Sequence, residues 1–282
     1  MEFIILCIKA TRPKQWIKNL LMAAAPIAAG QFESQITNIS LGVIGFTAAS
    51  VIGYLINDWI DKESDRNHPK KKFRPFASER LKLPSLIVML SMSSIVLILT
   101  CVILPTEFVF TIIVYLFITI SYTLLVKNLP VVEMIWLASG FLIRAIAGSA
   151  IIQEAPTGWF VVAVGFGALF IVSAKRLAEL KSNYSNLTRI VISQYKENFL
   201  NRVLTTSASI TLLTYSLWVF QVHPNSVLAQ FTILPLTLSI LLYSWHSENG
   251  DTESPENIIY KDKLLVLSGL TVIISLLFVI YK

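Results

Sequence analysis

The chain has 282 residues, of which 55% are hydrophobic and only 14% are charged, and its mean hydropathy is +0.68. Soluble domains contain about a quarter charged residues, so this composition excludes a water-soluble globular protein. It also excludes a disordered chain and a nucleic-acid-binding arm. Cys7 and Cys101 are the only cysteines, without a CxxC pair, so we expect neither a disulfide framework nor a zinc site. The composition predicts a polytopic membrane protein.

Long apolar runs predict about nine membrane-spanning helices, because each crossing needs about 20 mostly apolar residues. In chain order the predicted spans lie near 16–32, 38–56, 84–104, 108–126, 131–152, 159–175, 203–221, 227–245 and 264–281. Short turns that contain Pro105, Pro130 and Pro156 separate several of them. We therefore expect an all-α fold, a polytopic membrane bundle that forms a single integral membrane domain over residues 1–282.

The basic residues gather on one side of this predicted topology. Of the 23 Lys and Arg, 21 lie in one set of segments or at its helix ends: the N-terminus and the loops at about 57–83, 127–130, 176–202 and 246–263. The positive-inside rule places these segments in the cytoplasm and the C-terminus outside. Topology thus accounts for the formal net charge of +6, and no nucleic-acid partner is needed.

The first long loop begins with four oxygen-bearing side chains at helical spacing: Asn57, Asp58, Asp61 and Asp65. If the helix over 38–56 continues past the membrane, these four span about 100° of its circumference. Like charges at that spacing repel one another, and Mg²⁺ removes the repulsion because its ligands are carboxylates, amide oxygens and substrate phosphates. The pattern predicts a Mg²⁺ site, and the alternative is a solvated acidic helix end.

Charged residues elsewhere are candidates for binding an anionic substrate. Arg66 and Arg74 follow the acidic face, and Arg offers a bidentate fork to phosphate oxygens. Arg144 lies inside the fifth span, where an unpaired charge costs several kcal/mol. We expect its partner to be an anionic lipid headgroup or a carboxylate from another helix. At the end of the sixth span, the spacing of Lys175, Arg176 and Glu179 permits either an internal salt bridge or a substrate contact.

The spacing Asn57-Asp58-x-x-Asp61-x-x-x-Asp65 resembles the first aspartate-rich motif of the UbiA-type intramembrane prenyltransferase superfamily. The resemblance implies a helical fold of about nine spans, a cytoplasm-facing catalytic cavity and a Mg²⁺-bound diphosphate. Members that use aromatic acceptors carry a second aspartate-rich motif between spans 6 and 7. Here that place holds Lys175-Arg176-Leu177-Ala178-Glu179-Leu180, and no Asp occurs between Asp65 and Asp251.

Further motifs resemble one branch of that superfamily, the decaprenyl-phosphate phosphoribosyltransferases. They are Arg12-Pro13-Lys14-Gln15-Trp16-Ile17-Lys18-Asn19, Arg74-Pro75, Leu142-Ile143-Arg144-Ala145-Ile146-Ala147-Gly148, the segment from Lys175 to Leu180, and Pro255-Glu256. One departure is Glu133, where we expect Asp. The resemblance implies transfer of the phosphoribosyl group of 5-phosphoribose 1-diphosphate to a polyprenyl phosphate, with release of pyrophosphate.

The same resemblance implies roles for individual residues. The Mg²⁺ ligands would be Asn57, Asp58, Asp61 and Asp65. The catalytic residues would be Asp58, Asp61, Arg74 and Lys127. The substrate-binding residues would be Lys14, Lys18, Arg66, Arg74, Tyr122, Lys127, Arg144, Lys175, Arg176 and Glu179. The predicted partners are lipid-phosphate and diphosphate substrates and membrane lipids, a homo-oligomer is left open, and the predicted location is a bacterial-type inner (plasma) membrane.

Two other functions compete with this interpretation. A Mg²⁺-dependent prenyltransferase for an aromatic or quinone-precursor acceptor shares the fold, the metal and the cavity, but it would need the missing second carboxylate pair. A membrane transporter would distribute polar residues across several spans. Apart from Arg144 and Glu133, the spans are almost free of charge, which argues against transport.

Overall fold

The computed structural model of the protein describes residues 2–69, 71–181, 191–253, 258 and 262–282. Within these ranges the chain is helical and contains no β-strand, which confirms the predicted all-α class. Eight helices among the described residues are long and apolar enough to cross a membrane. Many of their large apolar side chains are exposed, such as Val102 and Phe117. Such a surface suits hydrocarbon rather than water.

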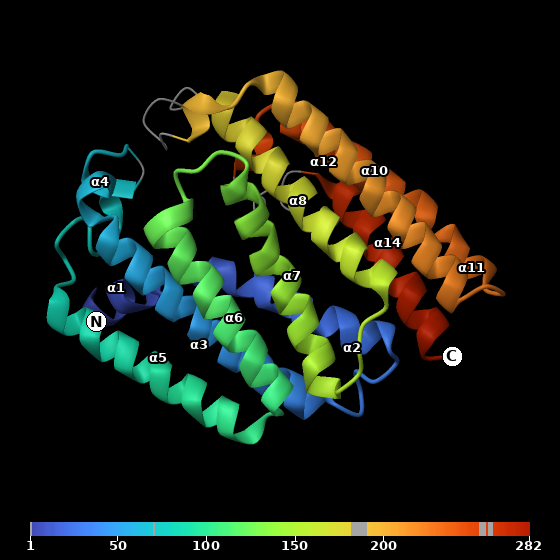
Figure 1. Ribbon diagram of the computed structural model, residues 1–282, viewed down its shortest axis with the longest axis horizontal. Helices are drawn as coiled ribbons and strands as arrows, with labels where there is room; N and C mark the ends of the chain where they lie inside the picture. The colour runs from blue at the N-terminus through green and yellow to red at the C-terminus, as the bar shows by residue number, and fades with distance from the viewer. Residues whose placement is uncertain (1, 70, 182–190, 254–257, 259–261) are drawn as a thin grey trace. The chain divides into compact units, whose positions relative to one another are not determined.

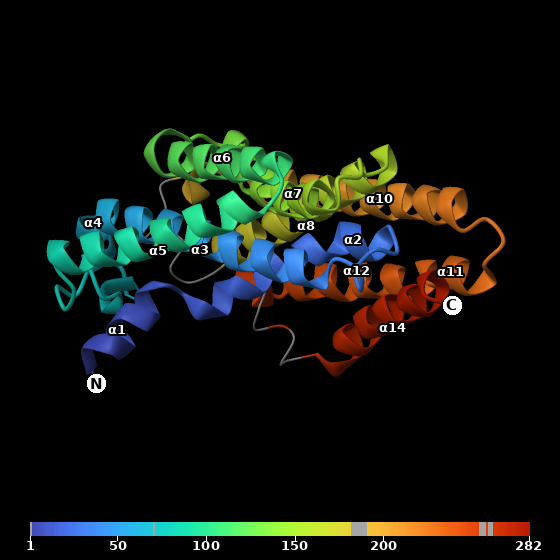
Figure 2. The ribbon, with the colours of Figure 1, turned by 90° about the horizontal axis from the view of Figure 1, so that it is seen from below.

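The chain groups into two compact units, and the first comprises Met1–Pro26, Gln31–Lys127 and Ile143–Ala155. In it, α3 packs against both α5 and α6 (Figure 1, Figure 2). The elements of this unit are α1 (Glu2–Ala10), η1 (Pro13–Ala23), α3 (Ile36–Ile60), α4 (Lys62–Arg66), η2 (Lys71–Phe73), α5 (Leu83–Ile103), α6 (Thr106–Ser121), the π-helical η3 (Tyr122–Val126) and the second half of α7 (Val132–Ile152).

The core of the first unit is centred on aromatic rings between α3 and α6. Phe46 is fully buried, and its ring centroid lies 6.0 Å from that of Phe108 and 5.0 Å from that of Tyr115. On the side of α5, a Cβ added to Gly45 would lie 2.5 Å from Thr100 Oγ1. Small residues that let neighbouring helices approach this closely are how helices associate in lipid.

The predicted span at 16–32 is not one continuous helix. The segment forms the 3-10 helix η1 and then the short α2 (Ala24–Ala28). Pro26 has no N–H to donate to the carbonyl oxygen of Met22, so a regular α-helix is interrupted there. That carbonyl faces α7, where a Cβ added to Gly148 would lie 1.9 Å from Met22 O. The count of nine spans is therefore approximate, because composition does not reveal a broken helix.

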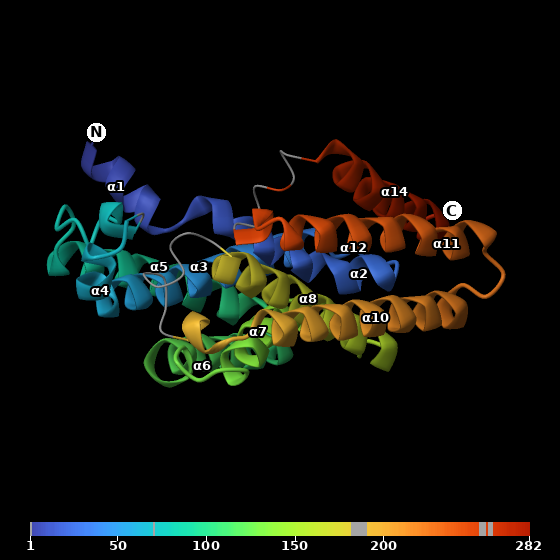
Figure 3. The same ribbon diagram turned by 90° about the horizontal axis from the view of Figure 1, so that it is seen from above.

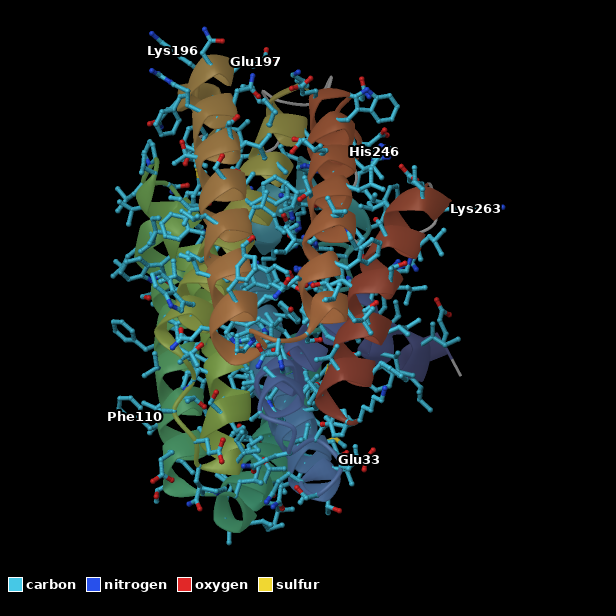
Figure 4. All side chains as sticks on the ribbon, turned by 90° about the vertical axis from the view of Figure 1, so that its right-hand side faces the viewer. Glu33, Phe110, Lys196, Glu197, His246 and Lys263 are labelled. Atoms are coloured by element: carbon cyan, nitrogen blue, oxygen red, sulfur yellow. The ribbon has the colours of Figure 1, made fainter. Side chains whose placement is uncertain are left out.

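The second unit comprises Ile27–Gly30, Asn128–Leu142 and Pro156–Lys282. Here α8 packs along α10, and α12 packs along α14 (Figure 3). Lys196, Glu197 and His246 lie at the same end of this unit (Figure 4). Its elements are the first half of α7, α8 (Gly158–Lys181), η4 (Ile192–Gln194), α10 (Glu197–Val222), α11 (Val227–Phe231), α12 (Ile233–Glu248), η5 (Asp251–Glu253) and α14 (Lys263–Ile280).

Candidate active site

The predicted acidic face lies at the end of α3 and in α4, which follow one another with helical hydrogen bonds across the joint. Asp61 N donates to Asn57 O at 2.9 Å, and Asp65 N donates to Asp61 O at 2.8 Å. Helical spacing therefore persists beyond the apolar part of α3, as predicted, and it places these three residues on one side of the helix. Asp58 and Asp65 are nevertheless buried rather than solvated. Their burial argues against the alternative of a solvated acidic helix end.

Each carboxylate of this face contacts a cationic side chain of the same unit. Asp58 accepts from Arg12 and, at 3.1 Å, from Arg74 Nη1. The same Arg74 nitrogen lies 2.6 Å from Asp65 Oδ2, and Lys127 Nζ lies 2.5 Å from Asp61 Oδ1. Three carboxylates are thus balanced by three cations, because a buried carboxylate without such a partner would be costly. We call Arg12, Asp58, Asp61, Asp65, Arg74 and Lys127 the ion-pair cluster.

Local structure positions the two arginines of the ion-pair cluster. Arg12 has a left-handed backbone (φ 53°) just before Pro13, and its guanidinium lies 5.1 Å from the centre of the Tyr54 ring. Arg74 lies in a turn that follows η2, where its carbonyl oxygen accepts from Ser78 at 2.9 Å. This turn is anchored by the buried Phe76. Both guanidiniums are therefore brought to the acidic face by backbone turns rather than by long helices.

A π-helical turn at the end of α6 supplies the other contacts. In η3 the amide of Lys127 donates to Tyr122 O, five residues earlier, at 3.0 Å. Thr123 is buried, and its hydroxyl oxygen lies 3.4 Å from Asn57 Oδ1. Thr123 and Lys127 are four residues apart, as are Asn57 and Asp61. Thr123 therefore faces Asn57 one helical turn away from where Lys127 faces Asp61. Single π-turns of this kind are frequent at functional sites.

Arg144 is buried in the first unit, in the second half of α7. Its Nε donates to Asn19 Oδ1 at 2.9 Å and its Nη2 to Tyr115 OH at 2.8 Å. The guanidinium carbon also lies 4.6 Å from the centre of the Tyr115 ring, and Nη2 lies 3.4 Å from Ser50 Oγ. The structure thus places neutral polar side chains of the same unit around the guanidinium, and an anionic partner for Arg144 stays a prediction.

Arg66, another predicted substrate-binding residue, pairs with acidic residues outside the ion-pair cluster. Arg66 turns to Glu63 at 2.9 Å and to Glu79, and its Nε donates to Ala77 O at 3.2 Å. Lys14 and Lys18 lie on η1, and Tyr122 begins η3. The roles of these four residues in substrate binding stay predictions. Pro255 and Glu256, quoted for the resemblance, lie outside the described residues.

The second unit holds a separate buried cluster around Arg176. Its Nε and Nη2 donate hydrogen bonds to the two carboxylate oxygens of Glu133, at 2.7 and 2.5 Å, and its Nη1 donates to Glu179. Both Arg176 and Glu133 are at most 1% exposed. Lys175 Nζ lies 4.0 Å from Glu179 Oε1. The internal salt bridge that the spacing permitted is therefore present, and a substrate contact by these residues stays a prediction.

Tyr195 extends this buried cluster to the start of α7. Its hydroxyl donates to Glu133 Oε1 at 3.2 Å and accepts from the backbone N–H of Val131 at 2.9 Å. Burial raises the pKa of Tyr195 to about 12, so the phenol stays protonated and can donate. Val131 has a left-handed backbone with φ of 68°, which is rare for a β-branched residue.

Four residues at these two sites were not among our predicted site residues. Arg12 stood within a quoted motif, but no role was assigned to it. Thr123 carried no signal of its own, because a four-residue spacing such as that to Lys127 is common to all helices. Glu133 carried a signal as a carboxylate inside a predicted span, whereas Tyr195 carried none. Their contacts could not be predicted, since they join residues 43 and 62 positions apart.

The acidic face has the donor chemistry of a Mg²⁺ site. Its three carboxylates and one amide offer hard oxygen ligands at helical spacing. In the part of the chain that the structure describes, no group of three His, Cys, Asp or Glu side chains is gathered tightly enough to hold a metal ion. The ion pairs explain this, because Arg and Lys side chains take the positions next to the carboxylates that a metal would need. The donor types fit Mg²⁺, which would have to displace Arg12, Arg74 and Lys127 from the carboxylates.

Comparisons with known proteins agree with this fold. The chain matches the UbiA prenyltransferase family over residues 20–260. It is 32% identical over 287 residues to a decaprenyl-phosphate phosphoribosyltransferase of Corynebacterium glutamicum, covering 97% of this chain and 86% of the relative. It is 34% identical over 277 residues to one of Mycobacterium tuberculosis, covering 93% and 90%.

A solved structure supports the same fold at lower sequence similarity. A UbiA homolog from Archaeoglobus fulgidus bound to GPP and Mg²⁺ matches with a TM-score of 0.73 and 15% identity, over 98% of this chain and 99% of that one. The resemblance drawn from the aspartate-rich motif is confirmed. The chain belongs to the UbiA prenyltransferase family, as an integral membrane transferase.

Proposed function

We propose that the protein transfers the phosphoribosyl group of 5-phosphoribose 1-diphosphate to a polyprenyl phosphate of the decaprenyl-phosphate type and releases pyrophosphate. The names of the relatives from Corynebacterium and Mycobacterium support this activity. The observation that carries it is the buried Arg176, which is paired with Glu133. Arg176 stands at the place in the chain where aromatic prenyltransferases have a second aspartate-rich motif. A diphosphate substrate that binds to one aspartate-rich face, and not to two, suits this arrangement.

The oxygen ligands of the acidic face and the cations of the ion-pair cluster would have different roles in binding the diphosphate. Asn57, Asp58, Asp61 and Asp65 would hold Mg²⁺, as the Mg²⁺-bound archaeal homolog suggests for the family. When bound, Mg²⁺ would neutralise negative charge that develops on the departing diphosphate. Arg74 and Lys127, released from their carboxylates, would then bind diphosphate oxygens with charge-assisted hydrogen bonds. Hydrogen-bond donors placed where charge develops in the transition state are usually the largest contribution to catalysis.

The transfer itself exchanges one C–O bond for another. The bond from ribose C1 to the diphosphate oxygen breaks, and the electron pair leaves with pyrophosphate. An oxygen of the polyprenyl phosphate forms the new bond to C1, and this acceptor needs no general base because a phosphate monoester is already ionised near neutral pH. Candidates for holding the acceptor phosphate are Lys14, Lys18, Tyr122 and Arg144. Arg66, Lys175, Arg176 and Glu179 complete the proposed substrate-binding set.

The basic loops support a proposed location and orientation. We propose that the whole chain is a single integral domain of a bacterial-type inner membrane, with the N-terminus in the cytoplasm and the C-terminus outside. The ion-pair cluster would then open to the cytoplasm, where a soluble sugar diphosphate is available. Membrane lipids would surround the exposed apolar helices and hold the polyprenyl tail of the acceptor.

Transfer of radiolabel tests the proposed activity. Purified protein is incubated with labelled 5-phosphoribose 1-diphosphate, a polyprenyl phosphate and Mg²⁺, and the organic extract is counted. We expect extractable label that is lost with EDTA and in Asp61→Ala. No such product, together with turnover of a prenyl diphosphate and an aromatic acid, would instead support the aromatic prenyltransferase.

A further inference from the structure

An apolar groove of about 620 Å³ lies against α3 in the first unit. One wall is η1, and the other is α5, which packs alongside α3 (Figure 1). This volume is within the range of about 300–1,000 Å³ that is typical of ligand pockets. Its lining includes Trp16 and Leu20 of η1, Ile44 and Val51 of α3, and Met92 and Ser93 of α5. Ile44 and Met92 are at least half exposed, so the groove opens among the apolar side chains that face hydrocarbon.

The chemistry of the lining suits a hydrocarbon chain. Thr47 and Ser93 are its polar residues, and the other lining residues are apolar. The Thr47 hydroxyl already accepts a hydrogen bond from Asn19 Nδ2 at 3.0 Å. A sugar diphosphate would find few hydrogen-bond partners here, whereas an isoprenoid or acyl chain needs none.

The walls formed by η1 and α3 run in opposite directions. Arg12, which precedes η1, contacts Asp58 near the end of α3, whereas Asn19 contacts Thr47 in the middle of α3. Residue numbers therefore rise along η1 as they fall along α3. Both walls reach the pair of Arg12 and Asp58 at the same end of the groove.

The groove face of α3 continues to the ion-pair cluster. Ile44, Val51 and Asp58 follow one another at intervals of seven residues, so they share one face of this helix. At a rise of 1.5 Å per residue, Asp58 lies about 10 Å beyond Val51 along the helix axis. On the opposite wall, the indole of Trp16 donates to Thr11 O at 3.0 Å, which ties the ring to the residue before Arg12. A molecule that fills the groove thus ends at two charged residues of the cluster.

We propose that this groove binds the polyprenyl phosphate acceptor, with the isoprenoid units nearest the phosphate against α3 and the phosphate beside Arg12. This inference rests on the proposed phosphoribosyl transfer. A guanidinium has five N–H donors, so Arg12 can bond to Asp58 and to a phosphate at the same time. Lys14, which is exposed, stands between Arg12 and Trp16 in the chain and adds a second positive charge at this end. An anionic head on a long apolar chain matches this order of charge and apolar surface, and the rest of the tail extends into the bilayer.

Photo-crosslinking tests the groove without turnover. The protein in lipid nanodiscs is irradiated with decaprenyl phosphate that carries a diazirine either in the isoprene unit next to the phosphate or in the third unit. Labelled residues are then identified by mass spectrometry. We expect the first probe to label the end that holds Trp16 and Val51, and the second to label the end that holds Leu20 and Ile44. Excess decaprenyl phosphate should remove both labels, and excess phosphatidylglycerol should not.

A matched pair of variants tests the groove in the transfer reaction. Ser93→Phe places a ring in the groove, and the KM for decaprenyl phosphate should rise at least about tenfold, because one misplaced methylene in an apolar pocket changes binding about 10–200-fold. The KM for 5-phosphoribose 1-diphosphate should stay at its wild-type value. Ser91→Phe makes the same change at an exposed position of α5 outside the groove lining, and it should leave both constants unchanged. If Ser93→Phe fails to fold, Ser93→Leu serves in the same comparison, and the crosslinking needs no variant.

Each outcome decides between the possible occupants of the groove. Labels that phosphatidylglycerol removes would show a general lipid site, and a groove without label that a second copy of the chain covers would show an oligomer contact. Either result, or equal effects of Ser93→Phe and Ser91→Phe, overturns the inference. If wild-type protein transfers the phosphoribosyl group while these tests fail, the proposed function stands and only the groove assignment falls. A wild-type protein that transfers nothing overturns both.

Discussion

Replacing Lys127 with Met should strengthen the binding of a divalent cation to the substrate-free protein. Lys127 Nζ lies 2.5 Å from Asp61 Oδ1, so a metal ion must displace the ammonium before it can use this carboxylate. The two side chains are 25% and 22% exposed, which makes the pair worth about 1 kcal/mol rather than the several kcal/mol of a fully buried one. Its removal should raise metal affinity about fivefold.

The same variant should bind diphosphate more weakly. In the complex the displaced ammonium would bind diphosphate oxygens, and a hydrogen bond to a charged group contributes about 1.5–3 kcal/mol. Pyrophosphate affinity in the presence of metal should therefore fall about tenfold or more. Opposite changes in the two affinities are what distinguish displacement of an ion pair from simple damage to the site.

Titration with Mn²⁺, with and without pyrophosphate, measures both effects. Lys62→Met is the matched control, because it removes one positive charge from the start of α4, where Lys62 lies 4.0 Å from the Trp59 ring centre. A general change in potential would affect both variants equally. The reasoning is refuted if Lys127→Met binds Mn²⁺ no more tightly than wild type, or if Lys62→Met binds it just as tightly.

Three further predictions concern stability and are measured by thermal unfolding in detergent. Gly148→Ala places a Cβ 1.9 Å from a backbone oxygen and should cost at least about 1–3 kcal/mol. Gly269→Ala, with open space inside α14, should instead stabilise slightly, by up to about 1 kcal/mol. Arg176→Met leaves the Glu133 carboxylate buried without its bidentate cation, and it should lower the free energy of unfolding by about 3–5 kcal/mol. A hydrogen bond from His246 holds the pKa of Asp262 below its usual range. Ionised Asp262 therefore stabilises the fold above about pH 4, and this stabilisation is lost as pH falls further. The variant Asp262→Ala should lack this pH dependence.

The local part of the site could be predicted from the sequence, because helical spacing is a short-range property. Asn57, Asp61 and Asp65 share a side of one helix whatever the rest of the chain does. The partners of these residues could not be predicted in the same way. Arg12 meets Asp58 across 46 positions and Thr123 meets Asn57 across 66, and no spacing rule connects such distant residues.

The membrane spans show a similar limit. Apolar composition predicted the helical class and eight of the nine spans, since hydrophobic length decides what can cross a bilayer. It could not predict that the run at 16–32 is divided into η1 and α2, because hydropathy averages side chains and does not register a missing backbone donor at Pro26. The cost of an unpaired charge predicts that Arg144 has a partner, but it does not predict which polar side chains surround it. Neutral oxygens of Asn19, Ser50 and Tyr115 can solvate a guanidinium as well.

The left-handed backbone of Val131 has a consequence for the freedom of the turn that carries it. A glycine at this position would adopt φ of 68° easily, but it would also visit many other conformations. A β-branched residue has few alternatives, and the hydrogen bond from its amide to Tyr195 holds it in an unfavourable one. The backbone therefore has little conformational freedom at this residue, directly before the start of α7.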